Sequence, residues 1–273
     1  MLQNTGRTNT LGNSRPTQNN NSMKKFFRRL SLIITLQTLI ISALAAVSTY
    51  FCVKYNWKAN FSLTLVATSI VFPIVFSIGG AYKRREVALR EYAAIKGYLR
   101  AIYFASRDWM PIVKPENVTK MEKIIERFFT NIRTLFSQST EHLEEGEKAV
   151  YKDFSDFSDY IKHDLREEGL SAGECSRTNQ FLQKMLISFE SLKHIYQYRT
   201  PRTLRAFSEL FIKVLPIAYG PYFAQINVSA PGLSYVIPVL LTMVIVSLHN
   251  IQDHLENPFD QVGEDDIKFN VEK

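Results

Sequence analysis

Four carboxylate side chains near the C-terminus come closest, by type and spacing, to a metal site. They are Asp260, Glu264, Asp265 and Asp266. Carboxylate oxygens this close together in a loop can hold Ca²⁺, although their spacing differs from that of an EF-hand loop. A solvated acidic loop is the alternative. The sequence therefore predicts no cofactor other than this calcium ion, and the calcium site is one of two alternatives.

No other group of side chains has the spacing of a catalytic site. The sequence contains no nucleotide-binding, metalloprotease or nucleophile-elbow motif. His249 and His254 are five residues apart, so they do not share a helix face as an i, i+4 pair would. Cys52 and Cys175 offer no disulfide framework. We therefore expect a protein that is not an enzyme, and no motif points to nucleic acid.

Long uncharged runs alternate with densely charged ones along the 273 residues. This is the pattern of an integral membrane protein with a soluble part. Leu30 to Val53 is a run of about 24 uncharged residues, long enough to span a bilayer. Phe61 to Ala81 is a second such run. Much of the net charge of +7 lies beside these runs, at residues 24–29 and 83–85, so the positive-inside rule puts both ends of the pair in the cytosol.

The third span, which follows Pro201, carries charge. Arg205, Glu209 and Lys213 fall at i, i+4 and i+8 on one helix face. They form either an interfacial ladder of ion pairs or a lining for a charged solute, because lone charges inside a span are costly. Gly220, with prolines on both sides, is expected to break this helix farther in.

The segment between the second and third spans is predicted to be a bundle of amphipathic helices. A single long helix, or two stacked ones, is expected from Phe61 to Trp109, because no strong stop separates its apolar and basic halves. Apolar side chains then recur at i, i+3, i+4 and i+7, which marks buried helix faces. One face comprises Val118, Met121, Ile124, Ile125, Phe128, Phe129, Ile132 and Leu135. Another comprises Phe181, Leu182, Met185, Phe189, Leu192, Ile195 and Tyr196.

The predicted fold class is all-α, with four transmembrane helices and a cytosolic helical bundle inserted between spans two and three. Residues 1–22 read as a disordered tail, with an organelle transit peptide as the alternative. The other divisions are residues 23–81 for spans one and two, 82–200 for the cytosolic domain, 201–250 for spans three and four, and 251–273 for a cytosolic tail.

Three stretches together resemble the bestrophin family of anion channels. The first is TSIVFPIVFSIGGAYKRRE, at residues 68–86, which is similar to the family's neck motif on its second helix. The second is YRTPRTLRAFSELFIKVLP, and the third is SLHNIQDHLENPF, at residues 247–259, with a Glu-Asn-Pro-Phe ending. Each motif is short, but their order and spacing agree over residues 24 to about 266.

The resemblance implies a homopentamer in the membrane lipid, with both termini cytosolic and one axial pore lined by the second helix. Phe72 and Phe76 match the neck aromatics, Thr68 the apolar position one turn earlier, and Arg84 the family's arginine. The chain departs from the family at Arg85-Glu86, where the family has an aromatic pair, and at polar Thr68.

Elementary physics supports this assignment. Phe72 and Phe76, at i and i+4, share one face of the second span. Five copies would form stacked aromatic rings, a hydrophobic constriction that can gate by dewetting. The positive ring edges would also favour a partly dehydrated anion. The alternative is that both phenylalanines pack against other helices or lipid.

Four basic side chains follow at the expected cytosolic mouth of the pore. They are Lys83, Arg84, Arg85 and Arg90. They would concentrate anions there, or they serve as positive-inside anchors of the span. The function expected from the sequence is a passive channel for chloride and similar monovalent anions. A plasma or inner membrane is the expected location, with an organelle membrane as the alternative. The alternative function is that of a membrane-anchored helical scaffold or regulatory protein with a non-conducting fold of the same type.

Overall fold

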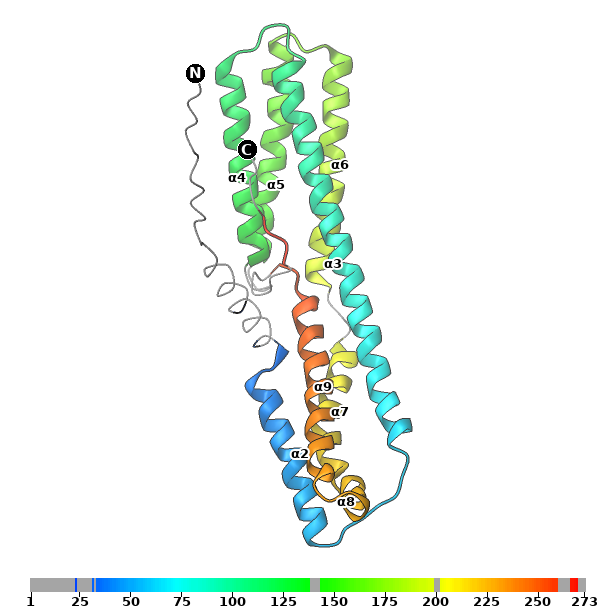
Figure 1. The fold of residues 1–273 in the computed structure, drawn as a ribbon. Coiled ribbons are helices and arrows are strands. Elements are labelled where there is room, and N and C mark those ends of the chain that lie inside the picture. Colours follow the sequence, from blue (N-terminus) through cyan, green and yellow to red (C-terminus); the bar gives the residue numbers. More distant parts are fainter. Residues whose placement is uncertain are drawn as a thin grey trace, which may run out of the picture. The chain divides into compact units, whose positions relative to one another are not determined.

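The computed structural model describes residues 23, 31, 33–137, 143–198, 202–259 and 266–269 (Figure 1). Every regular element among these residues is a helix, so the predicted all-α class is confirmed. The chain forms two compact units. One comprises Met1–Phe61 and Ile212–Asn250, and the other comprises Ser62–Phe211 and Ile251–Lys273.

Close helix packing organises the first unit. Its helix α2 spans Leu36–Lys54 and packs against the short helix α8, Gly220–Ser229. Gly220 permits this approach, because a Cβ atom there would lie 2.4 Å from Ser48 Oγ. The Ser48 hydroxyl also donates a hydrogen bond of 2.7 Å to the carbonyl of Ile217. A small residue at the contact thus allows two apolar helices to touch along their backbones.

Helix α9, Leu233–Glu256, adds the second long apolar element. Among the described helices, α2 and α9 are long and apolar enough to cross a membrane. The amide of Asn250 on α9 donates to the carbonyl of Ile33 at 2.6 Å and lies 3.3 Å from the hydroxyl oxygens of Thr35 and Thr38. This buried amide therefore ties the end of α9 within this unit to the first turn of α2.

The predicted helix break at Gly220 is confirmed, although Pro216 lies inside a helix without ending it. Helix α7 runs from Arg202 to Ala218, and α8 begins at Gly220. Pro221 follows in the first turn of α8, a position that needs no backbone donor.

The second unit is built on α3, Leu63–Asp108, a helix of 46 residues that continues through Pro73. The expected helix from Phe61 to Trp109 is thus one element. Helix α4 spans Pro115–Ser137, α5 spans Leu143–Asp159 and continues as a π-helical turn over Tyr160–Leu165, and α6 spans Ala172–Gln197. These helices lie side by side in Figure 1, and α3 packs along α6.

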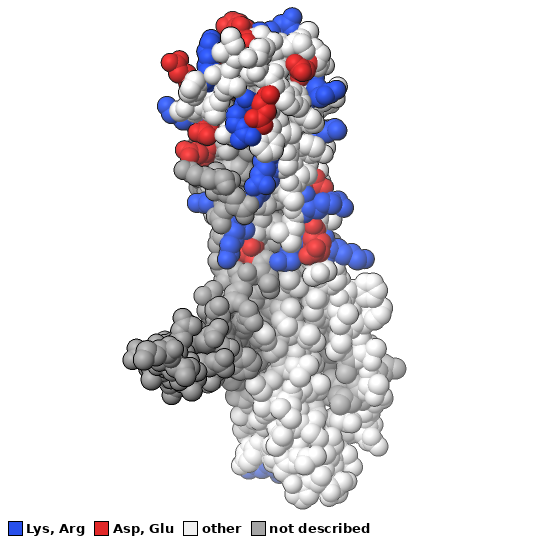
Figure 2. All heavy atoms as spheres, turned by 45° about the horizontal axis from the view of Figure 1, so that its top comes forward, with Lys and Arg blue, Asp and Glu red and all other residues white. Residues whose placement is uncertain are grey.

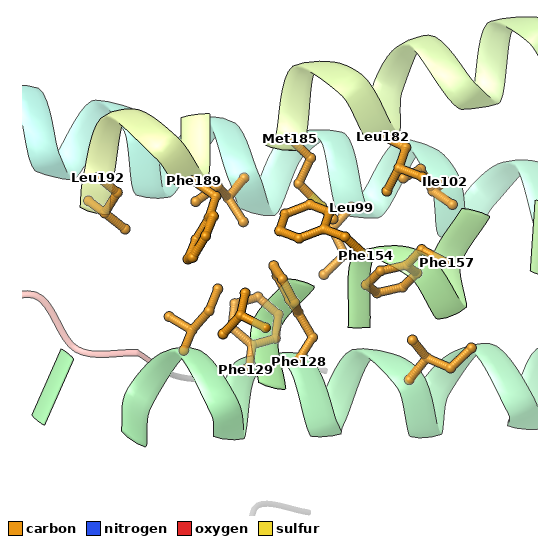
Figure 3. Close-up of a cluster of buried hydrophobic side chains, with 14 of the residues drawn as sticks. Leu99, Ile102, Phe128, Phe129, Phe154, Phe157, Leu182, Met185, Phe189 and Leu192 are labelled. Carbon is orange, nitrogen blue, oxygen red and sulfur yellow. The ribbon is translucent and has the colours of Figure 1, made fainter. Parts of the chain in front are cut away.

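The core of this bundle is aromatic and aliphatic, as Figure 3 shows. Most of the predicted faces are buried, including Met121, Phe128 and Ile132 on α4, while a few flanking positions such as Ile125 are partly exposed. Phe128 contacts Phe154 and Phe157 edge-to-face. The apolar residues that recur every three to four positions in the sequence therefore predicted this core well.

The segment after α9 also joins this core, whereas the sequence suggested a tail there. Phe259 stacks on Phe136 with ring centroids 4.9 Å apart, and Phe269 stacks on the same ring at 5.5 Å. Arg133 donates to the carbonyl of Phe269. Ile267 is buried beside them. The described part of the C-terminal segment is thus a packed strap across the bundle.

Candidate functional site

The predicted neck residues lie on an exposed face of α3. The side chain of Phe72 is 60% exposed and that of Phe76 is 65% exposed, and Thr68 is also exposed. The two phenyl rings lie 4.6 Å apart between centroids, tilted by 55°. Large apolar side chains this open within one chain mark a surface that meets another protein copy, lipid or a bound solute.

The opposite face of α3 is buried within the chain. Ile74, Ser77 and Ala81 are almost fully inaccessible beside the phenylalanines. Farther along, Ala88 and Leu99 enter the bundle core. Because one face is held by packing, Phe72 and Phe76 are directed away from the chain's own core.

The four basic residues predicted for the mouth differ in exposure. Lys83 and Arg90 are exposed, and the Arg90 side chain is 72% accessible. Arg84 and Arg85 are half-buried, and the side chain of Arg85 is only 18% accessible. The structure therefore divides the predicted mouth into two exposed and two half-buried cations.

Ion pairs accompany two of these cations. The guanidinium of Arg85 lies 3.0 Å from the carboxylate of Glu86, and that of Arg90 lies 3.3 Å from Glu91. Both pairs join neighbours in sequence and are partly exposed, so each contributes little to stability.

Arg205, predicted to belong either to a ladder of ion pairs or to a lining for a charged solute, pairs with the end of α9. Its guanidinium lies 3.0 Å from Asp253 and 3.2 Å from Glu256. The Glu256 side chain is 4% exposed, and Gln252 on the same helix is fully buried. Glu256 is the first residue of the Glu-Asn-Pro-Phe stretch that carries the family resemblance. Its ion pair with Arg205 joins α7 to α9 within the second unit.

The predicted calcium ligands fall mostly outside the described residues. Asp260, Glu264 and Asp265 lie outside, and Asp266, which is described, is half-buried. Within the described ranges, no three His, Cys, Asp or Glu side chains converge as metal ligands would.

A groove that the sequence did not indicate runs between α3 and α4, with a volume of about 670 Å³. Its α3 wall is basic and its α4 wall is acidic, over an apolar floor. The lining includes Lys96, Arg100, Arg107, Glu122, Glu126, Leu99, Ile125 and Phe129. Tyr103 donates to Glu122 across the groove at 3.2 Å, and Arg107 lies over the Phe104 ring. Figure 2 shows basic and acidic side chains interspersed over the charged part of the molecular surface.

No model of a known protein family matches the sequence, and no curated protein matches it. Solved structures do match. A bacterial bestrophin homologue from Klebsiella pneumoniae superposes with a TM-score of 0.67 at 15% identity, over 89% of this chain and 92% of that one. A variant of that homologue gives 0.69 at 13% identity, over 86% and 91% of the two chains.

A further structure, described as a membrane protein variant, gives a TM-score of 0.69 at 13% identity, over 85% of this chain and 92% of the other. All three likenesses extend over most of both chains. The chain therefore has a bestrophin-like fold, as the three sequence motifs indicated.

Proposed function

We propose that the chain is a passive anion channel for chloride and similar monovalent anions, with a pore lined by the N-terminal half of α3. The observation that carries the proposal is the exposure of Phe72 and Phe76 on the face of α3 opposite its packed side. The resemblance of the neck motif to that of a family of anion channels supports it.

The physical basis is a narrow apolar ring. In a symmetric assembly around α3, the two phenylalanines of each copy would surround the axis as two adjacent rings. Such a ring excludes water when narrow and admits ions when wetted, which makes it a gate. The partial positive charge at aromatic ring edges lowers the cost of anion passage relative to that of cations.

The membrane placement follows the apolar helices. We place α2, the first half of α3, the α7–α8 pair and α9 across the bilayer, with the α4–α6 bundle and both termini in the cytosol. Five copies would surround the pore, as in the family that the motifs resemble. Exposed apolar side chains on α2 and α9, such as Leu44 and Val244, would face lipid or neighbouring copies.

Chloride flux tests this proposal directly. The purified full-length protein is reconstituted in vesicles loaded with a chloride-sensitive dye, and empty vesicles serve as the control. We expect chloride entry down its gradient, with no need for an energy source. Absence of flux over a range of voltage, pH and Ca²⁺ concentration would overturn the channel function.

Assembly in detergent provides an independent measurement. Particles with a central axis through Phe72 and Phe76 would support the pore. A monomer or dimer would instead favour the scaffold function, in which the α4–α6 bundle binds a partner.

A further inference from the structure

Helix periodicity relates the cytosolic half of α3 to its neck. Eighteen residues of α-helix make five full turns, so Phe72, Arg90 and Asp108 point in the same direction from the helix axis. Arg90 lies about 27 Å along the axis from Phe72, at 1.5 Å per residue. Since α3 is continuous from Leu63 to Asp108, this register holds through both halves.

The four basic residues of the predicted mouth fall on different sides of this helix. At 100° per residue, Lys83 lies about 20° from the direction of Phe72 and Arg90 lies on it. Arg84 lies about 120° away and Arg85 about 140° away. Burial agrees with these angles, because Lys83 and Arg90 are exposed whereas Arg84 and Arg85 are half-buried.

The bundle core fixes this orientation. Leu99 lies 27 residues, or seven and a half turns, from Phe72 and therefore on the opposite side of α3. Leu99 is buried in the core, as are Tyr92 and Ile95 on the same side of the helix. The face that carries Phe72, Lys83 and Arg90 is thus the face that packing within the chain leaves open.

We infer that Lys83 and Arg90, and not Arg84 or Arg85, form the charged lining of the pore on the cytosolic side of the neck. This inference rests on the channel function proposed above. Each copy would contribute two cations to this lining, and rings of Lys and Arg are how pores favour anions. Arg84 and Arg85 would instead anchor and pack the helix.

Acidic neighbours do not cancel this lining. Glu86 lies about 40° from the direction of Phe72. Its carboxylate, 49% exposed, pairs with the Arg85 guanidinium at 3.0 Å, which offsets its charge. Glu91 lies on the packed flank, is 18% exposed, and contacts Arg90 at 3.3 Å. Residues 83–91 carry four basic and two acidic side chains, so the local field stays positive.

Between Arg90 and Asp108 this face of α3 carries no charged side chain. Over the next three turns it carries Ala94, Gly97 and Ala101, all small, and then Phe104. Lys83 and Arg90 are therefore the last cations that an anion would pass on this face of α3 before the neck. Their charge would raise the anion concentration where it limits entry from the cytosol.

Four single variants test the inference in planar bilayers. Lys83→Gln and Arg90→Gln remove charge from the open face, and Arg84→Gln and Arg85→Gln remove the same charge from the packed flanks. We expect the first two to lower chloride current entering from the cytosolic side about threefold at low salt, and the difference to vanish near about 1 M salt. The two flank variants should leave that current unchanged.

The outcomes separate the inference from the channel function. Equal losses of current in all four variants, or larger losses at Arg84 and Arg85, would overturn the inference while the wild-type current upholds the channel. A wild-type protein that assembles but carries no current would overturn both. Each variant is compared at matched assembly size, so a folding defect is not read as a charge effect.

Discussion

The guanidinium of Arg205, in the first turns of α7, lies 3.2 Å from the carboxylate of Glu256 at the end of α9. The Glu256 side chain is 4% exposed, whereas Arg205 is 44% exposed and also contacts Asp253 at 3.0 Å. The Arg205 guanidinium on α7 therefore stabilises the nearly buried Glu256 carboxylate on α9, although the two helices are far apart in sequence.

Arg205→Met should lower the thermal stability of the detergent-extracted protein. It leaves the Glu256 carboxylate buried without this partner, at a cost of about 2 kcal/mol. Asp253→Asn serves as the control, because Asp253 is partly exposed and its pair contributes less than about 1 kcal/mol. The double variant Arg205→Met with Glu256→Gln should recover part of the loss. Additive losses would show that the two side chains are not coupled.

Phe72→Ala combined with Phe76→Ala should widen the neck and alter gating or anion selectivity without loss of assembly. Helix α7 offers a matched control, because Phe207 and Phe211 form another i, i+4 pair with ring centroids 4.4 Å apart. Alanine at both control positions should leave ion selectivity unchanged. The measurement is the reversal potential in mixed anion solutions. A shift of equal size in the α7 variant would remove the special role of the α3 pair.

Arg127→Met should destabilise the helical bundle. Arg127 lies 2.5 Å from Asp153, which is 1% exposed and receives a further hydrogen bond of 2.7 Å from Asn131. Without the Arg127 guanidinium, the buried Asp153 carboxylate keeps only the hydrogen bond from Asn131. We expect the free energy of unfolding to fall by about 1–3 kcal/mol. Lys148→Met breaks the exposed pair with Glu144 and should cost less than about 0.5 kcal/mol. Denaturant unfolding measures the stability loss of each variant. A larger loss for Arg127→Met than for Lys148→Met would show that burial of Asp153 decides the cost, and equal losses would contradict it.

Tyr160 should make stability fall at alkaline pH. Burial raises the pKa of Tyr160 to about 12, and its hydroxyl donates to the carbonyl of Asn117 at 3.1 Å. Unfolded tyrosine loses its proton near about pH 10, so between about pH 10 and 12 the unfolded chain binds fewer protons than the folded one. The stabilising contribution is complete below this window and is lost as the pH rises through it.

Tyr160→Phe isolates this effect. At pH 8 it should cost about 1 kcal/mol, from the lost hydrogen bond. Above about pH 10 the melting temperatures of the variant and the wild type should converge, because phenylalanine does not ionise. Parallel pH dependence of the two proteins would show that Tyr160 titrates normally.

Gly220→Ala should loosen the contact between α2 and α8. The added Cβ atom would meet Ser48 Oγ at 2.4 Å and Cys52 Sγ at 3.0 Å, so the helices must separate, at about 1–3 kcal/mol. Gly173→Ala is the control, since nothing lies within 4 Å of a Cβ there. Thermal melts should show a loss for Gly220→Ala and little change for Gly173→Ala.

Local periodicity accounts for the parts of the fold that the sequence predicted. The stripe from Met121 to Leu135 repeats with the period of a helix, and the structure buries it on α4. The long helix followed from the absence of any stop near Ala81. These features depend only on residues close together in the chain.

Features that depend on distant contacts were not predicted. Phe259 and Phe269 lie in a segment with no helical period, and they are buried only because Phe136 and Tyr92 are brought to them by folding. The partner of Arg205 is 51 residues away at Glu256, so its spacing along α7 suggested an intrahelical ladder instead. The division of the four cations at residues 83–90 into two exposed and two half-buried ones also follows from the sequence, because the interval of 18 residues from Phe72 to Arg90 equals five helical turns.

The continuity of α3 has a mechanical consequence. Phe76 and Leu99 belong to one helix with no interruption between them, so a rotation of the helix at the bundle core is carried along α3 toward Phe76. A screw displacement by one residue would advance the helix by about 1.5 Å and turn the rings of Phe72 and Phe76 through about 100° about its axis. In the channel that we propose, a ligand that repacked the α4–α6 bundle around α3 would therefore turn Phe72 and Phe76.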